Sequence, residues 1–397
     1  MSMKQEKRNI LYLQSFYLLT FFGIGSLFPL LSVFLSGVEK LNGYQIGTIL
    51  SVGPIVTIFL QPFWGLISDA TNSPTKVLTI TTFLAGIFGF GYLAFGTYSM
   101  FFITAILIAI FQSAIIPVSD SISLKYSSRI NFNYGNIRLF GSLGFGTAVF
   151  IMGRLSEISP QIIFYSFFAS LSVAAILAFL LPKEKPTNQT KLLTGMKDLF
   201  KVRKFLVFLI ITFLIFGPNL ANNVYFGLFV DNLGGTYTGI GIAFLIAVLS
   251  EIPFMRVAGK AIQRFGLLQV AALAGAVSMV RWFFYAMEPS LALVYASAVI
   301  QGISIGLFIP AGLQYIRDIT PSHITATAVT IYSAIGNGLG NWFSTYIGGI
   351  ILDKYSIFGV YLFFGILASI GVLLTFWLIK MEKNSLVISH LSVQDHS

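Results

Sequence analysis

Apolar residues occupy this chain in long stretches that are separated by short breaks of polar residues, proline and glycine. A helix needs about 20 residues to cross a hydrocarbon core of ~30 Å, because each residue adds about 1.5 Å. Runs of that length predict an all-α membrane protein. They predict twelve transmembrane helices, over residues 9–35, 45–68, 76–97, 99–126, 136–157, 160–182, 204–231, 237–258, 265–286, 289–316, 322–352 and 356–380.

The lysines and arginines between these runs are distributed unevenly over the two sides of the membrane. Twelve spans place both chain ends on one side, and that side receives nineteen of these basic residues. The other side receives three, Lys40, Arg154 and Lys354. Since cytoplasmic loops collect lysine and arginine, we expect a multi-pass protein of the cell membrane with both termini in the cytoplasm.

Composition supports a membrane protein and excludes several other classes. Of the 397 residues, 56% are hydrophobic and only 10% are charged, whereas soluble domains carry about 25% charged residues. The net charge of +10 comes from basic residues between apolar runs, so we expect no nucleic-acid partner. The chain has no cysteine, which excludes disulfides and thiolate metal sites. We expect no metal, no cofactor and no enzymatic activity.

A polar insert, residues 182–204, divides the chain into two halves of six spans. A weak repeat supports this division, because at an offset of 194 residues Gly47 matches Gly241 and Gly65 matches Gly259. Transporters are often built from two such related halves. We therefore predict an N-terminal six-helix bundle, a cytoplasmic linker, a C-terminal six-helix bundle and a cytoplasmic tail, over residues 1–182, 183–203, 204–380 and 381–397.

Four charged side chains lie inside the predicted spans, namely Asp120, Arg138, Glu251 and Arg281. A charge at the bilayer centre costs about 2.5–3.5 kcal/mol on insertion scales, so these groups need partners or water. Asp120 and Arg138 each lie nine residues from the turn between their spans, and Glu251 and Arg281 each lie fifteen residues from theirs. Antiparallel neighbours therefore place an acid and an arginine at equal depth, where they can form a charge-assisted bond.

The shallower pair leaves alternatives open. Arg138 is either a working residue in a cavity or a border residue that snorkels to the membrane surface. Asp120 is either part of the same site or the partner in a local structural bond. Glu251 is too deep to snorkel, which favours a functional role for it.

Twelve spans, a basic central linker and the loop after the second span resemble the major facilitator superfamily. The family signature of that loop is G-x-x-x-D-R/K-x-G-R-K, and the chain reads GLISDATNSPTK, so that Gly65 and Asp69 match. The second half, GKAIQRFG, keeps Gly259 and Arg264 but has Gln263 at the acid position. The resemblance implies that the matching residues latch a cytoplasmic gate. The alternative is ordinary helix-end chemistry, which also favours glycine and cations.

Within the superfamily, the membrane charges resemble those of the lactose permease, phenylpropionate and nucleoside proton symporters. In NYGNIRLFGSLGFG, Arg138 precedes a glycine-rich run, as an arginine does in the fifth span of that group. The acids of the group's fourth and eighth spans fall on Asp120 and Glu251, and the arginine of its ninth span falls on Arg281. The resemblance implies that these four residues lie on the pathway of solute and proton.

Other positions depart from lactose permease and change the expected chemistry. Gln301 and Ser304 replace a histidine and a glutamate of the tenth span, so proton coupling falls to Glu251 or Asp120. Carboxyl groups in apolar surroundings take up a proton more readily than in water. Phe145 replaces the tryptophan that stacks on sugar, which makes a sugar less expected as the solute.

The seventh span contains GPNLANNVYFG, in which Gly217 and Pro218 predict a break in the helix. Asn222 aligns with an acid of lactose permease, and we interpret it as a neutral residue that lines the cavity. A polar bond between helices is an equally supported alternative. The run SAIGNGLGNW, residues 333–342, predicts close helix packing rather than a nucleotide loop, because no strand precedes it and no lysine ends it.

Together these features predict a secondary active transporter that works by alternating access. We expect proton-coupled symport of a small organic solute. Phe145 and the two arginines favour an aromatic or anionic solute over a disaccharide, and a nucleoside or a sugar also stays open. A proton-driven efflux antiporter and a non-transporting membrane sensor are the alternatives. The expected partners are the solute, protons and the lipid bilayer, and we expect a monomer.

Overall fold

The computed structural model describes residues 3–182, 199–321 and 324–394, and regular secondary structure in these ranges is helical throughout. Eleven helices of the described chain are long and apolar enough to cross a membrane, and three consecutive segments over Thr325–Lys354 complete the set of twelve as the eleventh span in chain order. The predicted twelve-helix fold is therefore confirmed. In chain order the elements are α1 (Met3–Gly37), α2 (Gly43–Ala70), α3 (Pro74–Phe88), α4 (Gly91–Ala94), α5 (Tyr98–Arg129), α6 (Gly135–Ser156), α7 (Ile162–Leu180), α9 (Arg203–Asn232), α10 (Tyr237–Phe265), α11 (Leu267–Ala286), α12 (Leu291–Ile319), α13 (Thr325–Ser333), η1 (Ala334–Gly340), α14 (Asn341–Lys354) and α15 (Ile357–Gln394).

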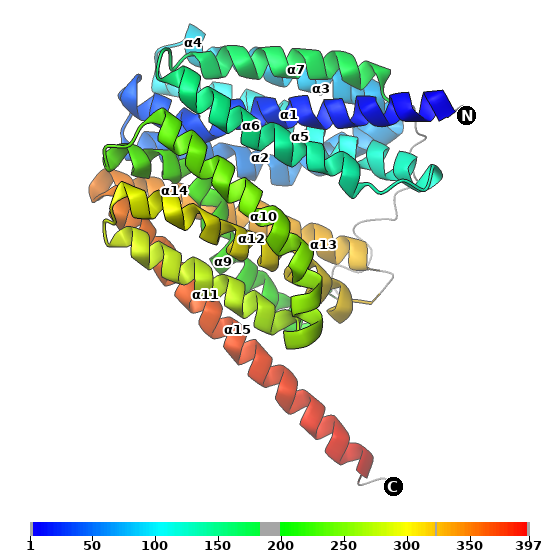
Figure 1. Cartoon of the computed structure of the whole chain (residues 1–397). Helices are drawn as coiled ribbons and strands as arrows, with labels where there is room; N and C mark the ends of the chain where they lie inside the picture. Colours follow the sequence, from blue (N-terminus) through cyan, green and yellow to red (C-terminus); the bar gives the residue numbers. More distant parts are fainter. Residues whose placement is uncertain (1–2, 183–198, 322–323, 395–397) are drawn as a thin grey trace.

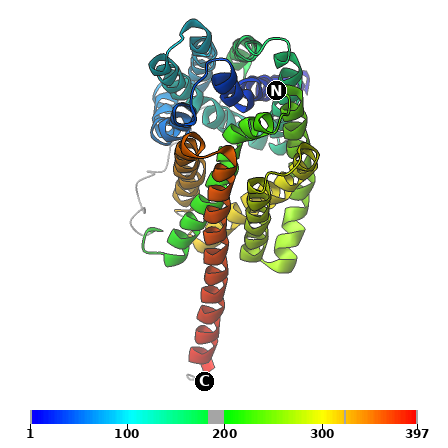
Figure 2. The same cartoon turned by 90° about the vertical axis from the view of Figure 1, so that its left-hand side faces the viewer.

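The helices form two groups that follow the order of the chain. In both views α1 to α7 lie together above α9 to α15 (Figures 1 and 2). In Figure 1 the N-terminus leaves α1 on the right and α15 runs to the lower right, and we call this side of the molecule the termini end. Within the first group α1 packs against α6 and α7, and within the second α11 packs against α12 and α15. Most of the predicted linker, 183–203, lies outside the described residues, so the predicted domain boundaries stay a prediction.

At their C-terminal ends, α10 and α15 extend well beyond the spans that hydropathy predicts. α10 continues through the polar sequence GKAIQRF to Phe265, although the apolar run was expected to end at residue 258. It ends at Gly266, whose φ of +94° lies in the region that favours glycine. α15 continues to Gln394, so most of the predicted tail is helical and projects from the body in Figure 1. Hydropathy marks where a helix is apolar, and hydrogen bonding lets the helix continue beyond that limit.

The break predicted at Gly217 and Pro218 is wrong, because α9 runs through both residues. A proline removes one helical hydrogen bond. The next residue adds another bond within the same turn of the helix, since Asn219 Nδ2 donates to the Ile215 carbonyl over 2.8 Å. The same amide donates to Ser278 Oγ of α11 over 3.0 Å. A polar side chain next to the predicted break therefore supports a continuous helix.

The small-residue run of the eleventh span packs closely against its neighbours, as predicted. A Cβ atom on Gly217 of α9 would lie 2.6 Å from the backbone of Gly340. A Cβ atom on Gly338 would lie 2.3 Å from the side chain of Ile58 in α2. η1 is a π-helical segment between α13 and α14, and its glycines let α9 and α2 approach it.

The two groups meet backbone to backbone at the end remote from the chain termini, which we call the contact end. A Cβ atom on Gly47 of α2 would lie 2.5 Å from the Cα atom of Gly349 in α14. A Cβ atom on Gly153 of α6 would lie 3.1 Å from the Cα atom of Gly241 in α10. The weak sequence repeat thus has a structural counterpart, because Gly47 and Gly241 each stand where a helix of one group crosses a helix of the other.

Replacing Gly47 by valine should prevent the contact end from closing, because the added atoms occupy the place of the Gly349 backbone. The chain has no cysteine, so spin labels on Val38→Cys and Tyr355→Cys report the separation of the two groups. We expect longer distances in the Gly47→Val protein. Gly53→Val is the matched control on the same helix, since a Cβ atom there meets nothing within 4 Å. Unchanged distances in Gly47→Val would show that the crossing tolerates a side chain.

Candidate functional site

Glu251, Arg281 and Gln301 form a polar chain inside the second group of helices. Arg281 is 2% exposed and Gln301 is 5% exposed. Nη1 of Arg281 donates a hydrogen bond to Oε1 of Gln301 over 3.1 Å, and the Gln301 side chain also interacts with the Glu251 carboxylate. An amide has an acceptor at one end and donors at the other. Gln301 is therefore suited to link a guanidinium to a carboxylate.

Close packing of α10 on α12 brings Glu251 within reach of Gln301. A Cβ atom on Gly302 would lie 2.3 Å from Ser250 Oγ, and one on Gly306 would lie 3.1 Å from the Glu251 carbonyl oxygen. These glycines are four residues apart and face α10, a spacing that allows membrane helices to approach closely. α12 thus places both the Gln301 amide and its own closely packed backbone beside Glu251.

Arg281 points into the protein and not toward lipid. Its Nε donates to the Tyr285 hydroxyl over 3.1 Å, and that hydroxyl lies 2.9 Å from Ser297 Oγ of α12. The guanidinium also lies 5.0 Å from the ring centroid of Trp282, a cation–π distance. Trp282 and Tyr285 are fully buried. This packing orients Arg281 inward, among buried side chains.

The direct bond expected between Glu251 and Arg281 is not formed in the described structure. Their equal depth does bring them to one site, but Gln301 stands between them and takes the guanidinium. Spacing along two helices fixes depth, whereas the side chain of a third helix decides which groups touch. Glu251 is therefore left with an amide partner and a more distant positive charge.

In the first group of helices, two tyrosines hold the carboxylate of Asp120. The Tyr17 hydroxyl of α1 donates to Asp120 Oδ1, and the Tyr134 hydroxyl donates to the same oxygen over 2.8 Å. Tyr17 is buried, whereas Asp120 and Tyr134 are partly buried. Hydrogen bonds to an ionised acceptor are the stronger class in proteins. We call these three residues the tyrosine clasp.

Arg138 lies beside the tyrosine clasp without forming the expected bond to Asp120. Its guanidinium carbon is 4.2 Å from the ring centroid of Phe21 and 5.7 Å from that of Tyr17. A Cβ atom on Gly141 would lie 2.5 Å from Nη1, so this glycine makes room for the guanidinium. Arg138 is turned toward α1, and its place on the solute pathway stays a prediction.

Phe145 and Asn222, the two uncharged residues predicted on the solute pathway besides Gln301, lie in different surroundings. Phe145 is partly buried and packs against the core beside α1, where a Cβ atom on Gly25 would lie 2.7 Å from its carbonyl oxygen. Asn222 is 1% exposed, and its Oδ1 accepts a hydrogen bond of 2.9 Å from the buried Tyr361 hydroxyl of α15. This bond between α9 and α15 favours the interhelical alternative for Asn222 over a cavity-lining role.

The predicted gate residues stand near the termini end of the molecule. Gly65 and Asp69 lie in the last turns of α2, and Gly259 and Arg264 lie in the last turns of α10. A Cβ atom on Gly259 would meet nothing within 4 Å, and the Arg264 guanidinium stacks on its neighbour Phe265 at 5.3 Å. Among the described residues, no hydrogen bond or ion pair joins these four to the other group of helices, so the latch stays a prediction.

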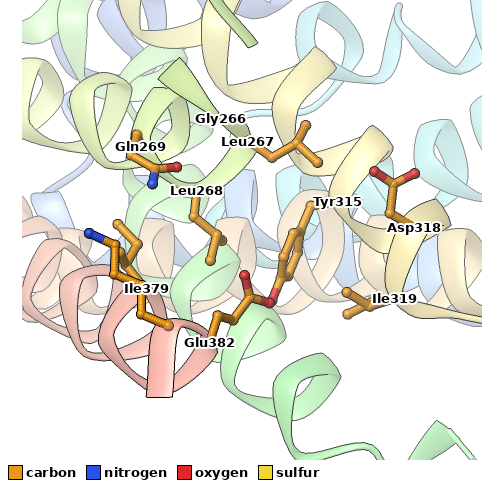
Figure 3. Close-up of a pocket in the computed structure, with 10 residues that line it drawn as sticks. Gly266, Leu267, Leu268, Gln269, Tyr315, Asp318, Ile319, Ile379 and Glu382 are labelled. Atoms are coloured by element: carbon orange, nitrogen blue, oxygen red, sulfur yellow. The ribbon is translucent and has the colours of Figure 1, made fainter. Parts of the chain in front are cut away.

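A cavity of about 470 Å³ opens between the start of α11, the end of α12 and residues 379–383 of α15 (Figure 3). On one side of it, the Tyr315 hydroxyl donates to Glu382 Oε1 over 2.8 Å, and Lys204 Nζ lies 3.5 Å from the same oxygen. These contacts tie α9, α12 and α15 together. None of the sequence-predicted site residues lines this cavity.

Sequence reasoning missed the hydroxyl groups that complete both sites, Tyr17, Tyr134, Tyr285 and Ser297. A signal was present for two of them. Tyr134 precedes Arg138 by four residues and Tyr285 follows Arg281 by four, and residues four apart share one face of a helix. Tyr17 and Ser297 come from other helices, and their identification required the fold.

Comparison with known proteins agrees with this architecture. The model of the MFS_1 like family matches residues 10–363. An uncharacterized transporter of Bacillus subtilis, YwbF, is 51% identical over 382 residues, which cover 96% of each chain. The maltose permease of Geobacillus stearothermophilus is 47% identical, over 93% of this chain and 94% of its own. The crystal structure of the nucleoside transporter NupG superposes with a TM-score of 0.82 at 20% identity, covering 94% of this chain and 99% of that one. The chain therefore belongs to the MFS_1 like family and is a transporter of the major facilitator fold.

Proposed function

We propose that the protein is a proton-coupled symporter of the cell membrane, with both termini in the cytoplasm. The observation that carries this proposal is Glu251, a carboxylate inside a transmembrane helix whose described partner is the amide of Gln301. Such a group can bind and release a proton without first breaking an ion pair. The distribution of lysine and arginine over the loops, nineteen against three, supports the orientation.

We further propose that the solute is a sugar, with maltose as the first to test. The relative named maltose permease is 47% identical over nearly the whole chain. We give this similarity more weight than the presence of Phe145 in place of a tryptophan. That replacement was one reason to expect an aromatic or anionic solute from the sequence. Arg138 and Gln301 supply donors that suit sugar hydroxyl groups. Under this proposal the contact end faces outward and the solute exchanges at the termini end.

Transport into vesicles tests the proposal. Right-side-out membrane vesicles that contain the protein should accumulate radiolabelled maltose when the outside is made acidic, and a protonophore should abolish the accumulation. Uptake driven by an acidic interior would instead identify an efflux antiporter. Binding without flux, seen as a rise in melting temperature with maltose, would identify a sensor. Neither flux nor binding would exclude maltose as the solute.

A further inference from the structure

We infer that Tyr17 and Tyr134 are positioning residues that hold Asp120 and thereby keep Arg138 available for the solute. The part of this inference that concerns the solute rests on the proposed function. The competition of two donors for Asp120 rests on the contacts of the tyrosine clasp alone.

The Asp120 carboxylate has hydrogen-bond donors without an arginine. Both hydroxyl groups donate to Oδ1 of Asp120, and each bond is of the charge-assisted kind. Tyr17 approaches from α1 and Tyr134 from the start of α6. Two donors from two helices fix the carboxylate in one place, while both helices also pack against each other.

Arg138 has no carboxylate partner among the described residues. Its guanidinium lies over the rings of Phe21 and Tyr17 and occupies the space that a side chain on Gly141 would fill. Tyr134 and Arg138 are joined by the helical bond from the Arg138 amide to the Tyr134 carbonyl, 3.0 Å long, so their side chains leave one face of α6. Asp120 therefore faces a hydroxyl and a guanidinium from the same helix.

The Tyr134 hydroxyl and the Arg138 guanidinium compete for one acceptor, the Asp120 carboxylate. A guanidinium usually binds a carboxylate with two parallel bonds. Without the tyrosine hydroxyls, Asp120 would be a partly buried acceptor with unmet bonds, and Arg138 is a cationic donor beside the tyrosine clasp. Arg138 would then be occupied by Asp120 and unavailable to the solute. The clasp thus sets which of two acceptors, the protein carboxylate or a solute oxygen, Arg138 binds.

Chemical labelling tests the competition without any solute. Phenylglyoxal modifies unpaired guanidinium groups, and peptide mapping compares Arg138 with Arg154, an exposed arginine on the same helix. We expect labelling of Arg138 relative to Arg154 to fall about tenfold in Tyr134→Phe, because a charge-assisted bond now protects it. Adding Asp120→Asn should restore the labelling. Equal labelling of Arg138 in the wild type and in Tyr134→Phe would overturn the inference. Since Tyr17 is buried and Tyr17→Phe can impair folding, Tyr134→Phe carries the test.

Maltose uptake provides the second arm. We expect the KM for maltose to rise about tenfold in Tyr134→Phe at a similar maximal rate, and to recover in the double variant with Asp120→Asn. A purely structural role for Tyr134 predicts that the second substitution makes uptake worse. Loss of maltose uptake in Asp120→Asn alone, with normal labelling of Arg138, would show that Asp120 itself touches the solute and would overturn the positioning role. If the wild type transports no maltose, the proposed solute fails while the labelling result still decides the clasp.

Discussion

Replacing Glu251 by glutamine should abolish the accumulation of solute against its gradient and leave exchange of solute across the membrane intact. Glutamine keeps the size and the hydrogen-bonding groups of a protonated glutamate, so it mimics the proton-loaded state. A transporter held in that state still binds solute and still reorients. It cannot couple movement to protons, because no proton is bound or released at this position.

The measurement compares two assays on the same vesicles. With an imposed proton gradient, we expect the concentration of labelled maltose inside Glu251→Gln vesicles to reach the outside concentration and not exceed it. Without a gradient, exchange of internal labelled for external unlabelled maltose should proceed at nearly the wild-type rate. Glu288→Gln is the matched control, because Glu288 is exposed beyond the end of α11. Accumulation by Glu251→Gln above the outside concentration would assign Glu251 a structural role and make Asp120 the leading candidate.

The surroundings of Glu251 explain why this residue is suited to coupling. Burial disfavours the charged form of a carboxyl group, and a nearby cation favours it. A direct bond to Arg281 would hold Glu251 ionised throughout the cycle. Gln301 accepts the guanidinium bond instead, so Glu251 is not held in an ion pair with Arg281 in the described structure.

The fold was predictable from the sequence because lipid imposes one dominant constraint. Backbone polar groups must be satisfied inside the membrane, so long apolar runs form helices, and all twelve predicted spans correspond to helical segments. The repeat of Gly47 and Gly241 was predictable for a related reason. A crossing that admits no side chain leaves a glycine in the sequence, and both glycines lie at such crossings.

The contacts within the sites were less predictable, because depth does not determine which neighbours touch. The spacing of Glu251 and Arg281 gave their common depth, but the amide that accepts the guanidinium bond comes from α12. The helix break at Pro218 failed for a similar reason. The cost of a missing backbone bond depends on what else the turn offers, and Asn219 offers a bond to Ile215. Asn222 likewise found a tyrosine of α15 that no local pattern reveals.

Arg138 is the residue whose removal should abolish transport most directly. We expect Arg138→Ala to lower maltose uptake about a hundredfold, because it removes a guanidinium that can make two charge-assisted bonds to a solute. Insertion into the membrane should be unchanged, since alanine is a good helix former and the variant takes a charge out of the bilayer.

The control for this variant lies on the same helix. Arg154→Ala removes an exposed arginine at the opposite end of α6, and its uptake should equal that of the wild type. Arg138→Lys distinguishes charge from shape, because lysine keeps the charge but cannot reproduce the planar fork of arginine or its stacking on Phe21. We therefore expect Arg138→Lys to recover little uptake. Wild-type uptake by Arg138→Ala, with equal amounts of protein in the membrane, would instead mean that Arg138 is a border residue and that its stacking on Phe21 only anchors the end of α6.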